Sequence, residues 1–233
     1  MVKNIYAETI WISDLHIGSN GCQKEKITHF LCSLNCKRVF LNGDIIDKFV
    51  LKNDVDITQD ECVRSLIELQ DKCEVTVLPG NHDSKEDLEK IFTKSQVIDE
   101  IVFTTKDNKR LLVFHGDKCD PSIKMRGQYI MVLGTRLYEF LLKFKKKTSG
   151  KHSVSRFFKR FIKLIIWVVF SYEKRLVNYI KTKECTGVIC GHSHNPIVKK
   201  MAGIDFINSG DWIDNCSYVV EDSKGNITLQ FWK

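Results

Sequence analysis

Five short polar motifs constrain the fold of this chain more than any other feature, because each follows an apolar run with at most one residue between. The runs are four to eight residues long and rich in β-branched types, which predicts strands at 5–12, 38–41, 75–78, 111–114 and 187–190. The motifs that follow are SDLH (13–16), NGDIID (42–47), GNHD (80–83), HGD (115–117) and GHSH (191–194). Carboxyl ends of strands in an α/β sheet converge on one edge, so we expect these loops to pool their side chains there.

Helical patterns lie between the predicted strands. Apolar residues recur at helical spacing over 23–34 and 57–70, and Ser84 stands three residues before Asp87, close to a capping box. This alternation predicts an α/β layered unit. A second sheet or an antiparallel edge is expected from three further short strands, at 204–208, 216–221 and 227–231.

One segment breaks this alternation and carries the basic character of the chain. Residues 121–172 hold twelve lysines and arginines against the single acid Glu139, a charge of +11, so the remainder of this +7 chain carries −4. The periodic patterns here predict a helical insertion at 121–170 within a single domain of residues 1–233. A localised basic field indicates an anionic partner or surface.

The cysteines and the N-terminal residues indicate in which cellular compartment the protein is expected. The nine cysteines are scattered, odd in number and without a CxxC pair, which argues against a disulfide framework. The first sixteen residues contain Glu8 and no apolar stretch long enough for a signal peptide, and the run at 164–170 is too short to cross a bilayer. We therefore expect a cytoplasmic protein.

The side chains of the motif loops form a metal-ligand set. Oxygen and imidazole nitrogen donors without a thiolate suit Mn, Fe, Zn or Mg, and we expect Mn. Seven donors are too many for one ion, whereas two ions about 3.5–4 Å apart, bridged by a carboxylate, would use them all. The donors are Asp14, His16, Asp44, Asn81, His115, His192 and His194.

In order along the chain, SDLH, GDIID, GNHD, HGD and GHSH resemble the motifs of the calcineurin-like metallophosphoesterases, and the resemblance extends to NSGDW at 208–212. It implies a four-layer α/β/β/α sandwich with the site at one end and a helical lid insertion. The ligand roles that it implies are Asp14, His16 and His194 for one ion, Asn81, His115 and His192 for the other, and Asp44 as the bridge.

His82 is left outside this ligand set. In the family that the chain resembles, the histidine of the GNH motif generally faces the phosphate, which implies that His82 is a general acid or transition-state donor. A histidine that titrates near neutral pH suits this role, because the departing alkoxide needs a proton. Asp83 is expected either to orient the ring of His82 or to cap the helix near Ser84. Asp47 is expected either to support the site from behind the ligands or to begin a helix.

Within the family, the chain resembles the UDP-2,3-diacylglucosamine pyrophosphatases of lipid A synthesis and their GNHD-containing relatives. The SDLHIGS and GDIID motifs carry this resemblance, together with the basic insertion between HGD and GHSH. It implies water attack on the phosphorus of a lipid-linked nucleotide. The lipid A enzymes usually carry arginine at the position of His82, so the sister group with GNHD stays open.

The insertion also bears on whether the substrate is lipid-linked, because apolar and basic residues are interleaved over 156–168. Such a helix suits the anionic inner surface of a membrane and predicts a peripheral contact there. The alternative is an apolar stripe that packs on a neighbouring helix and leaves a solvated basic face. We favour the lid or membrane interpretation, because charge of one sign near a phosphate site also steers anionic substrates.

Two other functions remain open from the sequence. A phosphodiesterase or nuclease acting on a soluble nucleotide or single-stranded nucleic acid would use the same metals, and aromatic residues beside basic ones can stack single-stranded bases. A non-catalytic binding module on this fold typically lacks ligands. Here no ligand is missing, so the sequence favours catalysis. It indicates no obligatory protein partner.

Overall fold

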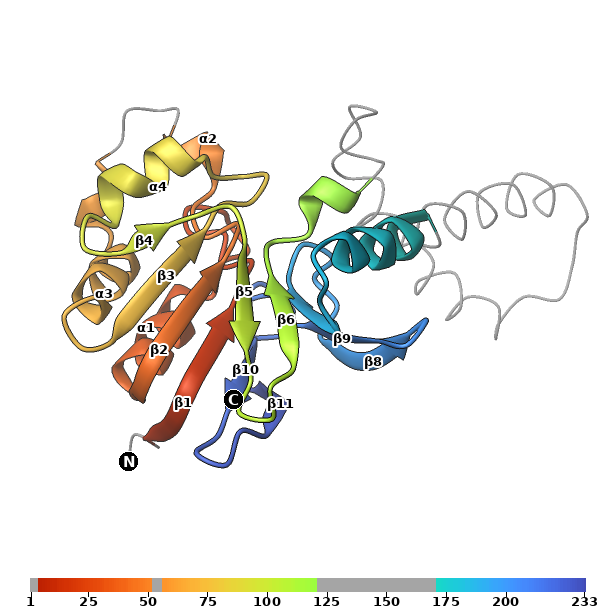
Figure 1. The fold of residues 1–233 in the computed structure, drawn as a ribbon. Helices are drawn as coiled ribbons and strands as arrows, with labels where there is room; N and C mark the ends of the chain where they lie inside the picture. Colours follow the sequence, from red (N-terminus) through yellow and green to blue (C-terminus); the bar gives the residue numbers. More distant parts are fainter. Residues whose placement is uncertain (1–3, 52–55, 121–170) are drawn as a thin grey trace, which may run out of the picture. The chain divides into compact units, whose positions relative to one another are not determined.

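The computed structural model describes residues 4–51, 56–120 and 171–233 of the chain (Figure 1). These residues fall into two compact units, one of Met1–Asp117 with Ile180–Lys233 and the other of Lys118–Tyr179. The predicted helical insertion at 121–170 lies outside the described residues. Everything that positions the motif loops belongs to the first unit.

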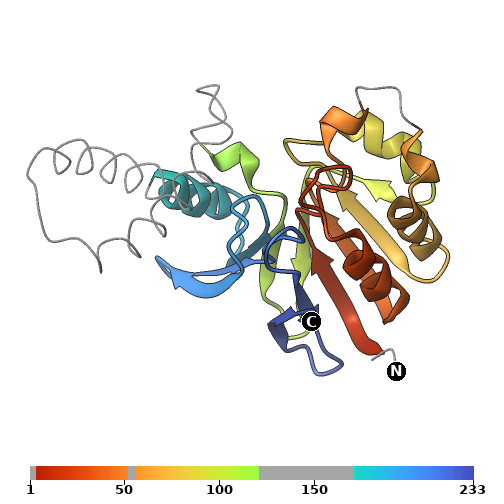
Figure 2. The same ribbon diagram turned by 180° about the vertical axis from the view of Figure 1, so that it is seen from behind.

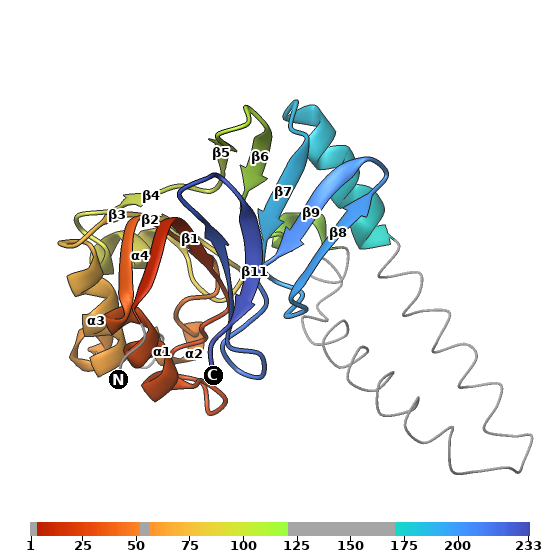
Figure 3. The ribbon, with the colours of Figure 1, turned by 90° about the horizontal axis from the view of Figure 1, so that it is seen from below.

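The first unit contains two sheets, which confirms a mixed α/β fold (Figures 1 and 3). The first sheet has the order β11-β10-β1-β2-β3-β4, in which β1 to β4 are parallel and β10 and β11 form an antiparallel edge. Its strands are β1 (Ile5–Ile12), β2 (Leu34–Asn42), β3 (Glu74–Leu78), β4 (Gln96–Val97), β10 (Ser217–Glu221) and β11 (Ile227–Phe231).

The second sheet has the order β5-β6-β7-β9-β8. Its centre, β6-β7-β9, is parallel, and β5 and β8 are antiparallel edges. Its strands are β5 (Ile101–Thr104), β6 (Arg110–Val113), β7 (Gly187–Cys190), β8 (Ile197–Met201) and β9 (Ile204–Asn208). The sequence patterns missed β4, β5 and β8, which are short or edge strands with few buried residues.

Alternation along the strands builds one core on each face of the first sheet. On β1, Ile10 and Ile12 pack into the core on one face, whereas Trp11 packs into the core between the two sheets. That second core also contains Phe40 of β2, stacked on Trp11, and Phe103 of β5, which meets it edge-on. A period of two therefore lets one strand contribute to both cores.

Helices supply the other side of the first core, and Figure 2 shows them from behind. The short helical elements are α1 (Lys24–Cys32), α2 (Lys48–Leu51), η1 (Ile57–Gln59), α3 (Glu61–Leu69), α4 (Lys85–Ile91) and η2 (Asp117–Cys119), and residues 171–182 are also helical. Ser84 caps α4 by accepting a hydrogen bond from the Asp87 N–H, which confirms the predicted cap.

Two predicted boundaries were wrong, each for a local reason. The helix predicted over 23–34 ends at Cys32, because Leu34 already pairs with Ile5 of β1. The helix predicted over 57–70 is divided, because Asp60 is extended and caps α3 through the Cys62 N–H. Pairing and capping outweigh the helical periodicity at both places.

Candidate metal centre

The five motif loops meet, but they come from two sheets and not from one. SDLH, NGDIID and GNHD follow β1, β2 and β3 of the first sheet, whereas HGD and GHSH follow β6 and β7 of the second. The expectation of a single sheet edge was therefore wrong, while the expected convergence of the loops is confirmed by the contacts below. Packing of the two sheets face to face brings both sets of carboxyl ends together.

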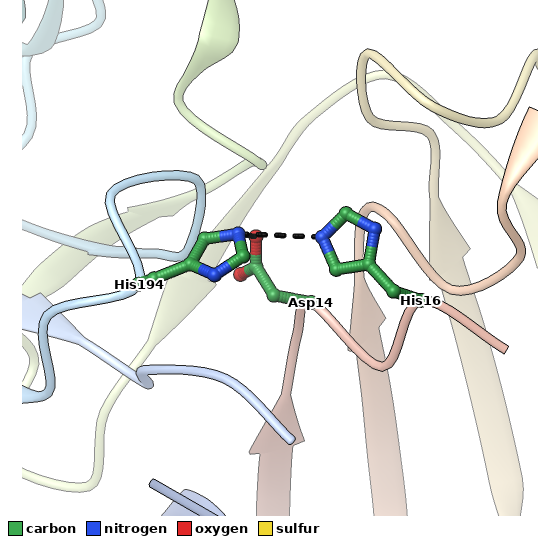
Figure 4. A group of neighbouring side chains, drawn as sticks. All are labelled: Asp14, His16 and His194. Atoms are coloured by element: carbon green, nitrogen blue, oxygen red, sulfur yellow. Dashed lines mark hydrogen bonds and ion pairs between the residues drawn. The ribbon is translucent and has the colours of Figure 1, made fainter. Parts of the chain in front are cut away.

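Three predicted ligands form what we call the aspartate group: Asp14, His16 and His194 (Figure 4). The Nε2 atoms of His16 and His194 face each other at 3.3 Å, and Nε2 of His194 lies 3.2 Å from Oδ1 of Asp14. Ligand atoms bound at about 2.1 Å to one tetrahedral ion stand about 3.4 Å apart. The spacing in the aspartate group therefore fits a shared divalent ion.

The asparagine group consists of Asn81, His115 and His192. Oδ1 of Asn81 lies 2.9 Å from Nδ1 of His192 and 3.3 Å from Nε2 of His115. The other nitrogen of His115, Nδ1, lies 3.0 Å from the carbonyl oxygen of Asn42. This contact leaves Nε2 directed at the group, as in metal sites where a backbone carbonyl orients a ligand histidine.

Asp44 lies between the two groups. Its Oδ2 is 3.4 Å from Nε2 of His115 and 3.7 Å from Nε2 of His16. Its Oδ1 accepts a hydrogen bond from the backbone N–H of His82 at 2.8 Å. A single carboxylate oxygen therefore faces both groups while the other oxygen anchors the GNHD loop.

Burial and opposite charges together set the pKa values of these groups. Burial acts to raise the pKa of Asp44, but the nearby histidines, His115 above all, together lower that pKa below its usual range. Burial acts to lower the pKa of His115, but Asp44 raises it well above the usual histidine value. The pKa of His194 is raised in the same way by Asp14, whereas burial lowers the pKa of His16.

The backbone around the ligands is strained. Five of the seven predicted ligands have positive φ, between 47° and 66°, a region that residues other than glycine rarely adopt: Asp14, His16, Asp44, His192 and His194. Each such residue costs on the order of 1–3 kcal/mol, and such residues cluster at functional sites. The loops therefore present their side chains at a cost in stability.

Gly80 and Gly191 are needed for space, and neither has the positive φ of a sharp turn. A Cβ on Gly80 would stand 2.2 Å from Oδ1 of Asp44, and one on Gly191 would stand 2.3 Å from Oδ2 of Asp14. Both glycines thus leave room for a ligand carboxylate.

The structure separates the roles of Asp47 and Asp83. Oδ2 of Asp47 lies 3.5 Å from Nδ1 of His82 and 3.9 Å from Nδ1 of His16, so Asp47 supports the site from behind the ligands.

Asp83 neither orients His82 nor caps α4, and both expectations for it were wrong. Its carboxylate accepts hydrogen bonds from the backbone N–H groups of Gly80, Asp44, Ile45 and Ile46, which ties the GNHD loop to the NGDIID loop. Burial raises the pKa of Asp83 to about 7.

The NSGDW segment contributes two residues that were not predicted as part of the site. Nδ2 of Asn208 donates to the carbonyl of Gly191 and to Oγ of Ser193, which braces the GHSH loop. Asp211 is fully buried and places Oδ2 4.0 Å from Nδ1 of His194. The only sequence signal for them was that NSGDW continued the motif series.

Both donor groups fit the hard or borderline divalent ions expected from the sequence. Imidazole nitrogens, carboxylate oxygens and one amide oxygen suit Mn, Fe or Zn. Two sets of neighbouring donors are Asp14, His16 and His194, and Asp14, Asp44 and His115. His16, Asp47 and His82 also fall within ligand spacing, so the position of His82 suits either a ligand or a proton donor.

A family model described as calcineurin-like phosphoesterase matches residues 8–196. The chain belongs to this family. It is therefore a metal-dependent phosphoesterase, and a mixed α/β sandwich with donor clusters at the strand ends is the fold and site expected of such an enzyme.

Solved structures with a similar fold have low sequence identity to this chain. An archaeal phosphodiesterase is 15% identical, with a TM-score of 0.49, and the match covers 96% of this chain and 98% of that one. Vacuolar protein sorting 29 from Cryptosporidium parvum is 13% identical, with a TM-score of 0.46 and 97% coverage of both chains. A predicted phosphoesterase from Streptococcus pneumoniae is 15% identical, with a TM-score of 0.41 and 97% coverage of both. No curated protein matches the sequence significantly.

Among residues 4–51, 56–120 and 171–233, no helix has the length and apolar character needed to cross a membrane.

Proposed function

We propose that this phosphoesterase uses two divalent ions to hydrolyse a phosphodiester or pyrophosphate bond. The observation that carries the proposal is the position of Asp44, whose Oδ2 lies within 3.7 Å of one histidine from each donor group. A shared carboxylate of this kind is how two-metal hydrolases hold their ions about 3.5–4 Å apart. When bound, such ions would supply an activated water and would neutralise charge on the phosphate.

In this proposal, the aspartate group holds one ion, the asparagine group holds the other, and Asp44 bridges them. Manganese is the expected metal. Asn42 would keep His115 oriented through its carbonyl, and Asp211 would lie behind His194. Orientation of ligand histidines from behind is worth about 10–100-fold in metal affinity in known sites.

His82 is proposed to give the proton that the leaving group needs. Its Nδ1 lies 3.5 Å from Oδ2 of Asp47, so that carboxylate stands behind the ring. Nε2 is then the atom that exchanges a proton with substrate. The backbone N–H of His82 donates to Asp44, so the general acid is held in register with the bridging carboxylate.

The proposed substrate is a lipid-linked nucleotide such as UDP-2,3-diacylglucosamine. Support comes from the sequence of 121–172, whose +11 charge and interleaved aromatic residues suit an anionic lipid substrate at the inner membrane surface. A soluble nucleotide or single-stranded nucleic acid is the second candidate, favoured by the same basic charge. A purely binding role is opposed by the complete set of seven donors in contact with one another.

A substrate panel tests the proposal. Purified protein is reconstituted with Mn and offered an aryl phosphodiester, UDP-2,3-diacylglucosamine, a cyclic nucleotide and single-stranded DNA. We expect hydrolysis of the aryl phosphodiester and the highest kcat/KM with the lipid-linked nucleotide. A preference for DNA would overturn the lipid substrate but keep the two-metal hydrolysis, and no metal-dependent turnover of any substrate would overturn both.

A further inference from the structure

Two cysteines lie side by side at the amino ends of β2 and β3, away from the metal centre. Cys36 is in β2, and Cys73 stands directly before β3. The strands are parallel neighbours in which Arg38 pairs with Glu74, so Cys36 and Cys73 are offset by one residue. Strand spacing of about 4.8 Å and a rise of about 3.3 Å place their Cα atoms about 5.8 Å apart. Disulfides span Cα separations of about 4.4–6.8 Å.

Their side chains also point the same way. Both pack against the helix-side core of the first sheet. The neighbouring thiol raises the pKa of Cys36 and lowers the pKa of Cys73. A pair in which one thiol ionises more readily suits thiol–disulfide exchange, because the thiolate is the nucleophile.

Access distinguishes this pair from every other cysteine except Cys22 and Cys32, because the remaining five are buried. Cys36 and Cys73 are both partly exposed, so a small disulfide can reach them, whereas Cys62 and Cys190 are buried. Cys32 is exposed but lies on α1. Cys36 and Cys73 therefore combine a suitable strand register, packing on the same face of the sheet and partial exposure to solvent.

We propose that Cys36 and Cys73 are a redox-active pair that forms a reversible disulfide tying β2 to β3. The thiolate of Cys73 attacks one sulfur of a low-molecular-mass disulfide such as oxidised glutathione, which forms a mixed disulfide and releases one glutathione. The sulfur of Cys36 then attacks the Cys73 sulfur and releases the second glutathione. The two protein thiols lose two electrons and two protons, and these convert one glutathione disulfide into two thiols.

The bond would stabilise the fold without rearranging the site. It would close the segment from 36 to 73, which constrains the unfolded chain. The pair lies at the end of β2 opposite the NGDIID loop, so the ligands of the metal centre need not move. The expected effect is a higher midpoint of thermal unfolding in the oxidised protein, on the order of 5 °C or more.

The test is oxidation of the folded protein with glutathione disulfide, followed by alkylation of free thiols, trypsin digestion and mass spectrometry. We expect a peptide pair linking 27–37 to 73–85 that dithiothreitol separates. Because 27–37 contains both Cys32 and Cys36, the link is assigned with two matched variants: Cys32→Ser should keep the linked pair, and Cys36→Ser should lose it.

Thermal unfolding provides the second readout. Oxidation should raise the midpoint of thermal unfolding of the wild type and of Cys32→Ser. It should leave the midpoints of Cys36→Ser and Cys73→Ser unchanged. Separate glutathione adducts on Cys36 and Cys73, or a linked pair that forms only in urea, would overturn the proposal. Loss of the linked pair in Cys32→Ser would also overturn it.

Discussion

The aspartate group and the asparagine group differ in charge, although both are built from buried or partly buried side chains at strand ends. The aspartate group contains the carboxylate of Asp14, whose pKa His194 lowers against the effect of burial. The asparagine group contains only neutral donors, the amide of Asn81 and two histidines. The asparagine group therefore depends on Asp44 for negative charge, and the aspartate group does not.

This difference shows how one fold can make two unequal metal sites from the same kinds of loop. Affinity for a divalent cation rises with the number of charged ligands. We expect the aspartate group to hold its ion more tightly and the asparagine group to lose its ion first. Substitutions at the bridging carboxylate, at the proton donor and within each group test this asymmetry.

The first prediction concerns Asp44→Asn, which keeps the shape of the side chain and removes the charge that both groups face. The variant should lose the ion of the asparagine group, and kcat/KM with Mn should fall about 10⁴-fold, because metal ions supply several kcal/mol of transition-state stabilisation. Steady-state kinetics and metal content by mass spectrometry measure both effects. Activity within tenfold of the wild type would rule out a bridging role.

The second prediction separates proton donation from metal binding at His82. Removing a general acid costs about 10²–10⁴-fold, so His82→Asn should lower kcat about 10³-fold while both metal ions stay bound. Asp47→Asn should lower kcat less, because it only positions the ring, and it should shift the pH profile of kcat. A lower metal content in both variants would instead assign His16, Asp47 and His82 as a ligand group.

The third prediction exchanges the charges of the two groups. Asp14→Asn should weaken metal binding at the aspartate group by about 10²-fold, since it removes the group's only charged ligand apart from Asp44. Asn81→Asp should strengthen binding at the asparagine group. Isothermal titration with Mn measures both, and equal effects of the two variants on the same binding step would break the proposed asymmetry.

The fourth prediction is that stabilisation of the fold by metal ions grows as pH rises. In the folded state, Asp44 raises the pKa of His115 and Asp14 raises the pKa of His194. These ion pairs stabilise the metal-free fold fully below about pH 6.5, the pKa of histidine in the unfolded chain. The stabilisation is lost as pH rises through the pKa values of the folded state. Metal ions need neutral histidines, so they bind more tightly as pH rises.

The difference between the unfolding midpoints of the metal-bound and metal-free protein should therefore grow above pH 6.5. Thermal scans with Mn or with a chelator, from pH 6 to 8.5, measure this difference. A difference that stays constant or shrinks over that range would contradict the assigned coupling.

Much of the fold was predictable because its signals are local. The parallel strands β1, β3 and β7 are short buried runs, and the cap at Ser84 depends on residues three positions away. Edge strands such as β8 were missed because polar residues, here two lysines, interrupt their apolar pattern. An edge strand takes its conformation from the neighbour that it pairs with, which sequence periodicity does not report.

The metal centre likewise has features that could be predicted from the sequence and features that could not. The donor types and the placement of each donor shortly after a strand were predictable from the sequence, since both depend on neighbouring residues. Three features became known only from the folded structure: two sheets supply the loops, Asp47 faces His82, and Asp83 ties two loops together. These relations depend on how distant strands pack and on which backbone N–H groups a buried carboxylate meets. Residues 39 positions apart, such as Asp44 and Asp83, leave no periodic signal of that contact.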